Sequence, residues 1–311
     1  MHISLTILAR GNTLEEFEAL LRKYLGQASK SYHLIVFIPD NPERYAALAH
    51  SLGFARPMTL VSEKWNATTL AAAIENESSH VVLFDNQKVS FRTPSFLDSL
   101  LANWASSDVD LVHCSSIAPR LGSDFRPMMP ELHSRSIAES FLLEAEVVPI
   151  AADGVWNKLV SLELLKNVCA HLGQGGEPSP LTDFFLNLAI LRYATSYKSL
   201  EYPVFTYSDH RQPSDLFLEE GREVLLAWEY APALWPKENP AILEAVRGVF
   251  AKRCATAVGR GLIALDTSGE DAAMALLSFF GGDTMLLTRL LALALATNTQ
   301  KRSRSKDAVY P

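Results

Sequence analysis

The stretch HVVLFDNQKV, His80 to Val89, is a short apolar run that stops abruptly at an acid. Residues 81–84 carry only valine, leucine and phenylalanine side chains, which favour a buried strand. Asp85 follows directly, and the amides Asn86 and Gln87 come next. The stretch therefore predicts a buried strand with a polar carboxyl end. It leaves open whether Asp85 caps a loop or holds a ligand.

On both sides of this strand, apolar runs alternate with segments whose apolar residues recur at helical spacing. Thr13 and Glu16 have the spacing of a capping box at the first helix, and Gly53 ends the second. Such alternation is typical of βαβ units, in which helices cover both faces of a mostly parallel sheet. The expected strands span residues 3–8, 33–38, 58–62, 80–84 and 109–115, and the helices span 15–25, 43–54, 67–77 and 94–105.

Beyond residue 118 the segments become less regular, and from residue 213 helical segments dominate. We therefore expect an α/β domain over residues 1–212 and a helical C-terminal region over residues 213–311. The other expected elements are a loop or irregular strand over 118–149, helices over 153–168 and 180–194, and a strand over 199–211.

The composition limits the class of protein. The 311 residues are 48% hydrophobic and 20% charged, as in ordinary globular domains. The formal net charge of -7 argues against broad contacts with nucleic-acid phosphates, but not against a local basic pocket for a phosphorylated ligand. The 3 cysteines lie far apart, which predicts reduced thiols in a cytoplasmic protein. We find no signal peptide and no apolar run of about 18 residues, so we expect no transmembrane segment.

Several common enzyme motifs are absent. The first expected strand is followed by LARGNT and not by a GxGxxG sequence, which argues against a dinucleotide site. No GxxxxGK[ST], GxSxG or HExxH sequence occurs. The protein is therefore not expected to be a P-loop NTPase, a serine hydrolase of that type or a zinc protease. Instead, acids stand at strand ends and before helices, namely Asp40, Asp85, Asp153 and Asp183. Parallel sheets bind ligands at the carboxyl ends of their strands, which is where Asp40 and Asp85 are expected.

The order of these features resembles the family 2 glycosyltransferases, which have the nucleotide-sugar-binding GT-A fold. The similarity covers Ile3 to Ser214 and rests on the order and spacing of several segments. HVVLFDNQ stands where that family has its DxD motif, and PLTDFF stands where it has the acid that opens a helix. The other similar segments are ISLTILARGN, LIVFIPD, SEKWNATTLAAAIENE, VWNKLVSLELLKNV and YPVFTYSDHRQPS.

The resemblance implies a GT-A (Rossmann-like) α/β fold and a hexosyltransferase-like activity in polysaccharide or glycoconjugate biosynthesis. A sugar would pass, with inversion, from a nucleotide-sugar donor to a hydroxyl of a glycan or glycoconjugate acceptor. Asp183 would be the general base that takes the proton of this hydroxyl. The implied donor-binding residues are Asn12, Asp40, Asp85, Lys158, His210 and Arg211, of which Lys158, His210 and Arg211 would reach the diphosphate.

The metal site implied by the family is degenerate in this sequence. Asn86 and Gln87 stand where a second acid would follow Asp85. A Mg²⁺ or Mn²⁺ ion can be held by one or two carboxylates with phosphates and water, so Asp85 alone is a weak metal ligand. A non-catalytic relative that binds or scaffolds is therefore an alternative. A nucleotidyltransferase is a further alternative, against which the lack of a glycine-rich basic loop near Gly11 argues.

Each assignment also has a structural alternative. Asp183 could be a helix cap or an ordinary first-turn acid, and Asp40 could be a turn residue in PDNP. Lys158 could be a solvated lysine on a helix. Trp156 could pack in the core and not stack on a sugar.

The C-terminal region lies outside the resemblance. Its last expected helix, residues 284–297, consists mostly of leucine and alanine, and a basic tail follows at residues 301–306. This helix could pack on the first domain or on a second copy in a homo-oligomer. With the basic tail it could instead contact an anionic membrane surface from the cytoplasmic side.

Overall fold

A computed structural model describes residues 4–29, 31–85, 88–91, 93–118, 123–125, 137–139, 154–173, 181–207, 213–235, 240–264 and 288. The chain divides into two compact units, Met1–Asp209 and His210–Pro311. The division therefore follows residue 209, against the expected residue 212. None of the helices in the described part of the chain combines the length and apolarity needed to cross a bilayer.

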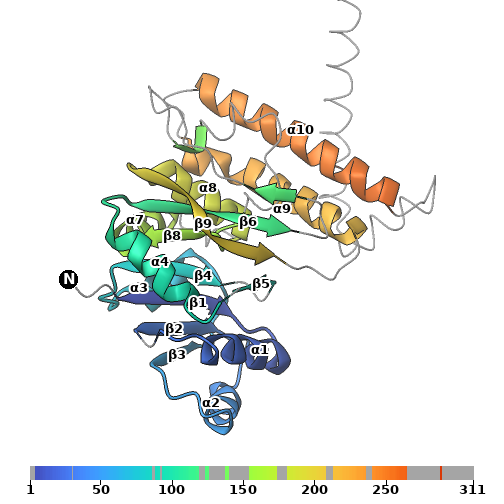
Figure 1. The fold of residues 1–311 in the computed structure, drawn as a ribbon. Helices are drawn as coiled ribbons and strands as arrows, with labels where there is room; N and C mark the ends of the chain where they lie inside the picture. Colours follow the sequence, from blue (N-terminus) through green and yellow to red (C-terminus); the bar gives the residue numbers. More distant parts are fainter. Residues whose placement is uncertain are drawn as a thin grey trace, which may run out of the picture. The chain divides into compact units, whose positions relative to one another are not determined.

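The described strands of the first unit form one sheet in the order β3-β2-β1-β4-β8-β6-β9-β5, with β7 paired to β6 (Figure 1). The pairs β1–β2, β2–β3, β1–β4 and β6–β9 are parallel, whereas β8 is antiparallel to both its neighbours, β4 and β6. The strands are β1 Leu5–Arg10, β2 Tyr32–Phe37, β3 Met58–Val61, β4 Val81–Asp85, β5 Val89–Ser90, β6 Leu111–Ala118, β7 Ser123–Phe125, β8 Lys158–Ser161 and β9 Tyr197–Tyr207.

The helices of the first unit begin where the sequence supplies caps. Thr13 and Glu16 form the predicted capping box of α1, and Gly53 has a φ of 68° just beyond the end of α2. Asn66 caps α3, with its side chain accepting from the Thr69 N–H. These helices are α1 Leu14–Leu25, α2 Pro42–Ser51, α3 Ala67–Ile74, α4 Phe96–Ala105, α7 Leu162–Gly173 and α8 Asp183–Tyr193.

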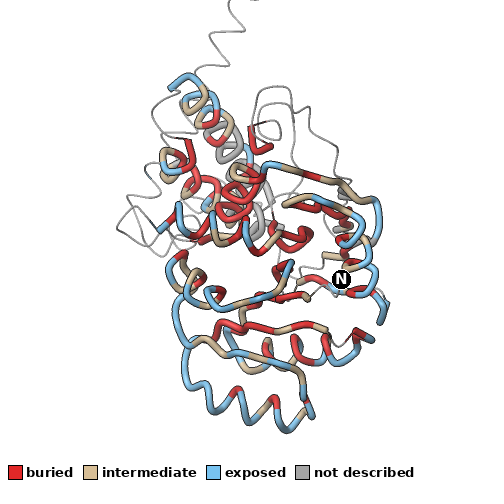
Figure 2. Tube along the Cα trace, turned by 90° about the vertical axis from the view of Figure 1, so that its left-hand side faces the viewer, coloured by how far each residue is buried: buried red, intermediate tan, exposed pale blue. Residues whose placement is uncertain are grey.

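Helices cover both faces of the sheet, as predicted. Alternate residues of β1, such as Leu5 and Ile7, join one core cluster with apolar side chains of α1, α2 and α4. The intervening positions, such as Leu8, Ile35 and Val82, are also buried, and α7 packs against α3 and α8. Figure 2 shows long runs of buried residues inside the first unit and exposed segments around them. The central strands are apolar on both faces for this reason.

The structure corrects the predicted helix over residues 153–168. Residues 158–161 form β8, and α7 begins only at Leu162. Val160 pairs with Val82 of β4 and with Leu111 of β6, so this short strand lies between two others. A helix and a strand are both compatible with the spacing of the apolar residues Leu159, Val160 and Leu162. Only pairing with the neighbouring strands favours the strand.

In the second unit, α9 (Pro213–Leu234) and α10 (Pro240–Ala264) pack against each other. The helix α9 continues through Pro232 and ends at Leu234. Buried residues of this unit include Val224, Leu225, Val246 and Phe250. The expected helix over 284–297 and the basic tail lie outside the described residues, apart from Thr288, so their packing, oligomer and membrane roles stay predictions.

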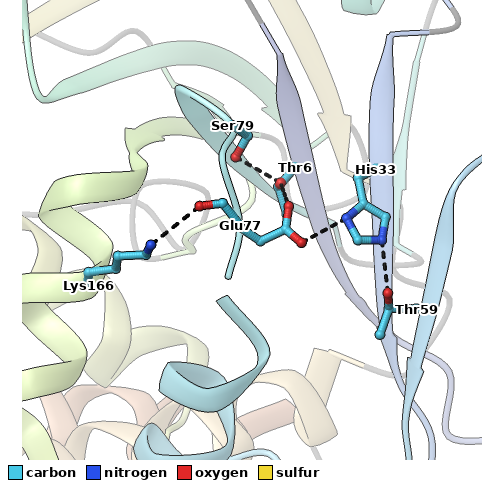
Figure 3. Close-up of polar contacts among 6 residues, drawn as sticks. All are labelled: Thr6, His33, Thr59, Glu77, Ser79 and Lys166. Carbon is cyan, nitrogen blue, oxygen red and sulfur yellow. Dashed lines mark hydrogen bonds and ion pairs between the residues drawn. The ribbon is translucent and has the colours of Figure 1, made fainter. Parts of the chain in front are cut away.

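A polar cluster ties together the amino ends of β1, β2 and β3, at the opposite edge from the strand ends that carry Asp85 (Figure 3). Thr6 Oγ1 on β1 lies 2.8 Å from Glu77 Oε2. Glu77 Oε1 lies 2.9 Å from His33 Nδ1 on β2, and His33 Nε2 lies 2.9 Å from Thr59 Oγ1 on β3. Glu77 therefore links the turn before β4 to β1 directly and to β3 through His33.

We expect Glu77→Ala to destabilise the protein by about 1–3 kcal/mol, because the buried Thr6 and the half-buried His33 lose their common partner. Urea unfolding followed by circular dichroism measures this difference. Glu75→Ala is the matched control, since this exposed neighbour has no side-chain hydrogen bond among the described residues. Equal losses in the two variants would contradict a role for the cluster.

Candidate active site

The sheet register brings two strand ends together at one edge. Ala9 of β1 pairs with Asp85, the last residue of β4, so Arg10 at the end of β1 lies at the same edge. Asp183, the first residue of α8, borders the same cleft. The cleft is narrow in this structure, with about 10 Å³ open to a water-sized sphere, far below the roughly 300–1,000 Å³ of a typical ligand pocket. Its lining residues are Leu8, Ala9, Arg10, Trp65, Phe84, Asp85, Val155, Trp156 and Asp183.

Asp183 is held at the start of α8 with its carboxylate in an ion pair. Thr182 is the cap, because its side chain accepts a hydrogen bond from the Phe185 N–H at 3.1 Å. Asp183 Oδ1 accepts from Arg10 Nη2 at 2.6 Å, and the two side chains are 20% and 36% exposed. Asp183 is therefore free of the capping role, and it remains accessible to a ligand in the cleft.

Aromatic rings surround this ion pair. The guanidinium carbon of Arg10 lies 5.4 Å from the centroid of the Trp65 ring, a cation–π distance. The indole Nε1 of Trp65 is buried and has no hydrogen-bond partner among the described residues. Trp156 is buried and stacks on Tyr207 with ring centroids 5.1 Å apart, so it belongs to the core while also lining the cleft.

Asp85 is also ion-paired, with a lysine that the sequence analysis did not select. Lys23 Nζ of α1 lies 2.7 Å from Asp85 Oδ1 and also donates to the Val89 carbonyl at 2.9 Å. The Asp85 side chain is only 1% exposed and that of Lys23 is 14% exposed. Burial, followed by the charge of Asp85, raises the pKa of Tyr24 well above its usual value, so Tyr24 stays protonated beside this pair.

This environment does not fit a divalent metal on Asp85. The Lys23 ammonium, 2.7 Å from Oδ1, already supplies this carboxylate with a positive charge, which disfavours a second cation beside it. In the part of the chain that the structure describes, no group of three His, Cys, Asp or Glu side chains could hold a metal ion. Asp85 thus has its countercharge from the protein itself. Asn86 and Gln87 lie outside the described residues.

Of the other predicted donor residues, the three that the structure describes, Asn12, Asp40 and Lys158, do not line the cleft. Asp40 is exposed after β2, next to Asn41, whose left-handed φ of 47° and side-chain cap begin α2. Asn12 is exposed, and its N–H donates to Glu16 at 2.9 Å in the first turn of α1. His210, Arg211 and Asp153 lie outside the described residues, so the proposed role of the first two is untested.

Lys158 lies on β8 and not on a helix, and it is fully buried. Its Nζ donates to the Gly154 carbonyl at 2.7 Å and to Asn157 Oδ1 at 2.9 Å. Burial and the charge of Lys158 lower the pKa of the neighbouring His113 well below its usual value. The structural alternative of a solvated lysine is therefore wrong, and the ammonium is engaged inside the protein.

Sequence reasoning missed Arg10, Lys23 and Trp65. Arg10 had a usable signal, because it is the charged residue that ends an apolar strand next to the predicted ligand edge. Lys23 had none, since it reads as an ordinary basic residue in the last turn of α1. Its partner Asp85 is 62 positions away, and only the tertiary fold brings the two together.

Comparison with known proteins supports the fold. No model of a known protein family matches the chain, and no curated protein matches its sequence. S. aureus TarS 1-349 in complex with UDP-GlcNAc is 11% identical with a TM-score of 0.52, over 96% of this chain and 92% of that one. The mannosyltransferase PcManGT from Pyrobaculum calidifontis, solved with GDP-Man and Mn²⁺, is 15% identical with a TM-score of 0.54, over 96% of this chain and 88% of that one. These likenesses confirm the predicted GT-A-like α/β fold, with a mostly parallel sheet flanked by helices.

Proposed function

We propose that this protein is a glycosyltransferase that moves a sugar from a nucleotide-sugar donor to a hydroxyl of a glycan or glycoconjugate, with inversion. The observation that carries the proposal is the position of Asp183. Its partly exposed carboxylate stands at the start of α8, in one cleft with the carboxyl ends of β1 and β4. Ligands of α/β sheets bind at this edge. Two solved proteins of similar fold bind UDP-GlcNAc and GDP-Man, which supports the donor class.

In the proposed reaction, the acceptor oxygen attacks the anomeric carbon from the side opposite the leaving group. The new glycosidic C–O bond forms while the bond between the anomeric carbon and the phosphate oxygen breaks. Asp183 takes the proton of the acceptor hydroxyl, and the nucleoside diphosphate leaves with the bonding electrons. Asp183 suits this step because Thr182, and not Asp183, satisfies the helix cap.

We assign no step of this reaction to a metal on Asp85, because Lys23 already neutralises that carboxylate. In the proposal Asp85 shapes the inner wall of the cleft beside Phe84. Asn12, Asp40, His210 and Arg211 remain proposed donor contacts, with Asp40 directed to the base or ribose. A homo-oligomer, contact of the C-terminal region with an acceptor, and peripheral contact with a membrane likewise remain proposals.

Isothermal titration of the full chain with UDP, GDP, ADP, CDP and dTDP tests the donor site. Binding of one of them with a preference over the others is the expected result. The matching sugar nucleotide, for example UDP-GlcNAc or GDP-mannose, would then be used for released-nucleotide assays with candidate acceptors. Folded protein that binds none of the nucleotides would refute the donor site.

A non-catalytic relative of glycosyltransferases is the second candidate. It is favoured by the ion pairs of Asp183 with Arg10 and of Asp85 with Lys23, which engage both cleft carboxylates. Slow hydrolysis of the bound sugar nucleotide separates the two candidates, measured as released nucleoside diphosphate with and without manganese. An enzyme releases nucleotide in an Asp183-dependent manner, whereas a binding module releases none.

A further inference from the structure

The Arg10–Asp183 ion pair presents the proposed reaction with a conflict. One oxygen of the proposed base, Asp183 Oδ1, already accepts a hydrogen bond from Arg10 Nη2 at 2.6 Å, so Arg10 competes with an acceptor hydroxyl for this carboxylate. At the same time, a nucleoside diphosphate entering this cleft meets the carboxylate of Asp183, whereas that of Asp85 is buried and paired with Lys23. The diphosphate therefore needs a positively charged partner, whereas Asp183 can act as a base only when Arg10 no longer engages its carboxylate.

We propose that Arg10 resolves both needs by exchanging partners, so that donor binding draws it from Asp183 to the diphosphate and uncovers the base. This inference rests on the proposed function and adds a donor-binding residue to it. Arg10 is then a phosphate ligand in the donor complex and the partner of Asp183 in the free protein. The base becomes available only when a donor is present to react.

The geometry makes Arg10 suited to this exchange. The pair is partly exposed, at 36% for Arg10 and 20% for Asp183, so opening it costs less than opening a buried ion pair. A guanidinium binds phosphate through two parallel N–H groups, which gives a geometric preference for the diphosphate. In the free protein the Trp65 ring lies beside the guanidinium, with its centroid 5.4 Å from the guanidinium carbon.

The other basic side chain near the cleft is not suited to the exchange. Lys23 is 14% exposed, and its partner Asp85 is 1% exposed. Withdrawing Lys23 would leave a buried carboxylate without its countercharge, at a large cost. Opening the Arg10–Asp183 ion pair thus requires little free energy, whereas opening the Lys23–Asp85 ion pair requires much more. The ion pair that opens more easily is the one that contains the proposed base, Asp183.

A double-mutant cycle of nucleoside diphosphate affinities tests the exchange. The wild type, Asp183→Asn, Arg10→Met and the double variant are titrated with the nucleoside diphosphate that the wild type prefers. Asp183→Asn frees Arg10, so the nucleotide should bind about 2- to 5-fold more tightly. Arg10→Met should weaken binding by about 10- to 100-fold. Arg10→Lys keeps the charge without the two parallel donors and should fall between the wild type and Arg10→Met.

The decisive comparison is the effect of Asp183→Asn in the two backgrounds. The exchange predicts that its gain disappears once Arg10 is methionine, because no competition for the guanidinium is left. An equal gain in both backgrounds would mean that Asp183 merely repels the diphosphate, and would overturn the inference. No gain in either background would overturn it as well. Arg44→Met is the matched control, since this exposed arginine lies outside the cleft and should leave the affinity unchanged.

Failure of the wider proposal is recognised separately. If no folded variant binds any of the five nucleotides, the donor site itself is refuted and the exchange falls with it. If the wild type binds but the cycle shows no coupling between positions 10 and 183, the donor site stands and only the exchange is refuted. Thermal melts of each variant establish that the titrated protein is folded.

Discussion

Asp183→Asn is expected to lower kcat for sugar transfer by about 10²- to 10⁴-fold, the contribution typical of a general base. The amide keeps the shape of the side chain at the start of α8 but cannot take the proton of the acceptor hydroxyl. The affinity for the nucleoside diphosphate should not fall, because the change releases Arg10 from its ion pair. The measurement is a released-nucleotide assay at saturating donor, with the fold followed by circular dichroism.

Asp98→Asn provides the matched control for this substitution. Asp98 is an exposed acid in the first turn of α4, so it has the same relation to a helix dipole but lies outside the cleft. If Asp183 were only a first-turn acid, both variants would lose about 0.3–1 kcal/mol of stability and neither would lose activity. A fully active Asp183→Asn enzyme would therefore remove the base assignment.

Much of the fold could be predicted because its signals are local. Thr13 and Glu16 lie three positions apart, and the capping box they form needs no distant partner. The apolar run ending at Asp85 marks a strand that is buried on both faces, whatever its neighbours are. The β8 strand could not be predicted, because its apolar residues fit the spacing of a helix as well as that of a strand. It forms a strand because it pairs with β4 and β6. In the sequence, β6 and β8 are separated from each other by about forty residues.

The candidate site is predicted only partly by local patterns. The βα order places Asp40 and Asp85 at the carboxyl ends of strands, and the structure has Asp85 but not Asp40 in the cleft, where Asp183, chosen through the family resemblance, also lies. What each carboxylate contacts is a tertiary property. Arg10 is 173 positions from Asp183, and neither sequence segment indicates the other. Sequence patterns can predict that charged residues lie at this edge of the sheet. Which of them form ion pairs with each other can be known only from the tertiary structure.

Lys23→Met is expected to destabilise the protein by about 3–5 kcal/mol, which would be the largest effect on stability among these substitutions. It removes the ammonium 2.7 Å from Asp85 Oδ1 and leaves a carboxylate that is 1% exposed without a countercharge. Asp85 Oδ2 has no hydrogen-bond partner among the described residues, so the carboxylate depends on the contact of Oδ1 with Lys23. Urea unfolding curves with an unchanged slope give the difference in unfolding free energy.

Two further variants separate charge from packing. Asp85→Asn combined with Lys23→Met removes the buried charge as well, so the double variant should recover most of the stability that Lys23→Met loses. Arg22→Met is a matched control on the same helix, because its ion pair with Glu18 is exposed, and its loss should be small. A double variant no more stable than Lys23→Met would show that the methylene stem of Lys23, and not its charge, matters.

The same variants decide whether Asp85 is a metal ligand. A metal that binds only the folded protein raises its melting temperature in proportion to the logarithm of the metal concentration. Because Lys23 occupies the place of a cation, Mn²⁺ should not stabilise the wild type through Asp85. Removing Lys23 would open that place, and Mn²⁺ should then partly restore the stability of Lys23→Met but not that of the double variant. Stabilisation of the wild type that Asp85→Asn abolishes would instead show that metal and lysine compete for one carboxylate, with the metal stronger.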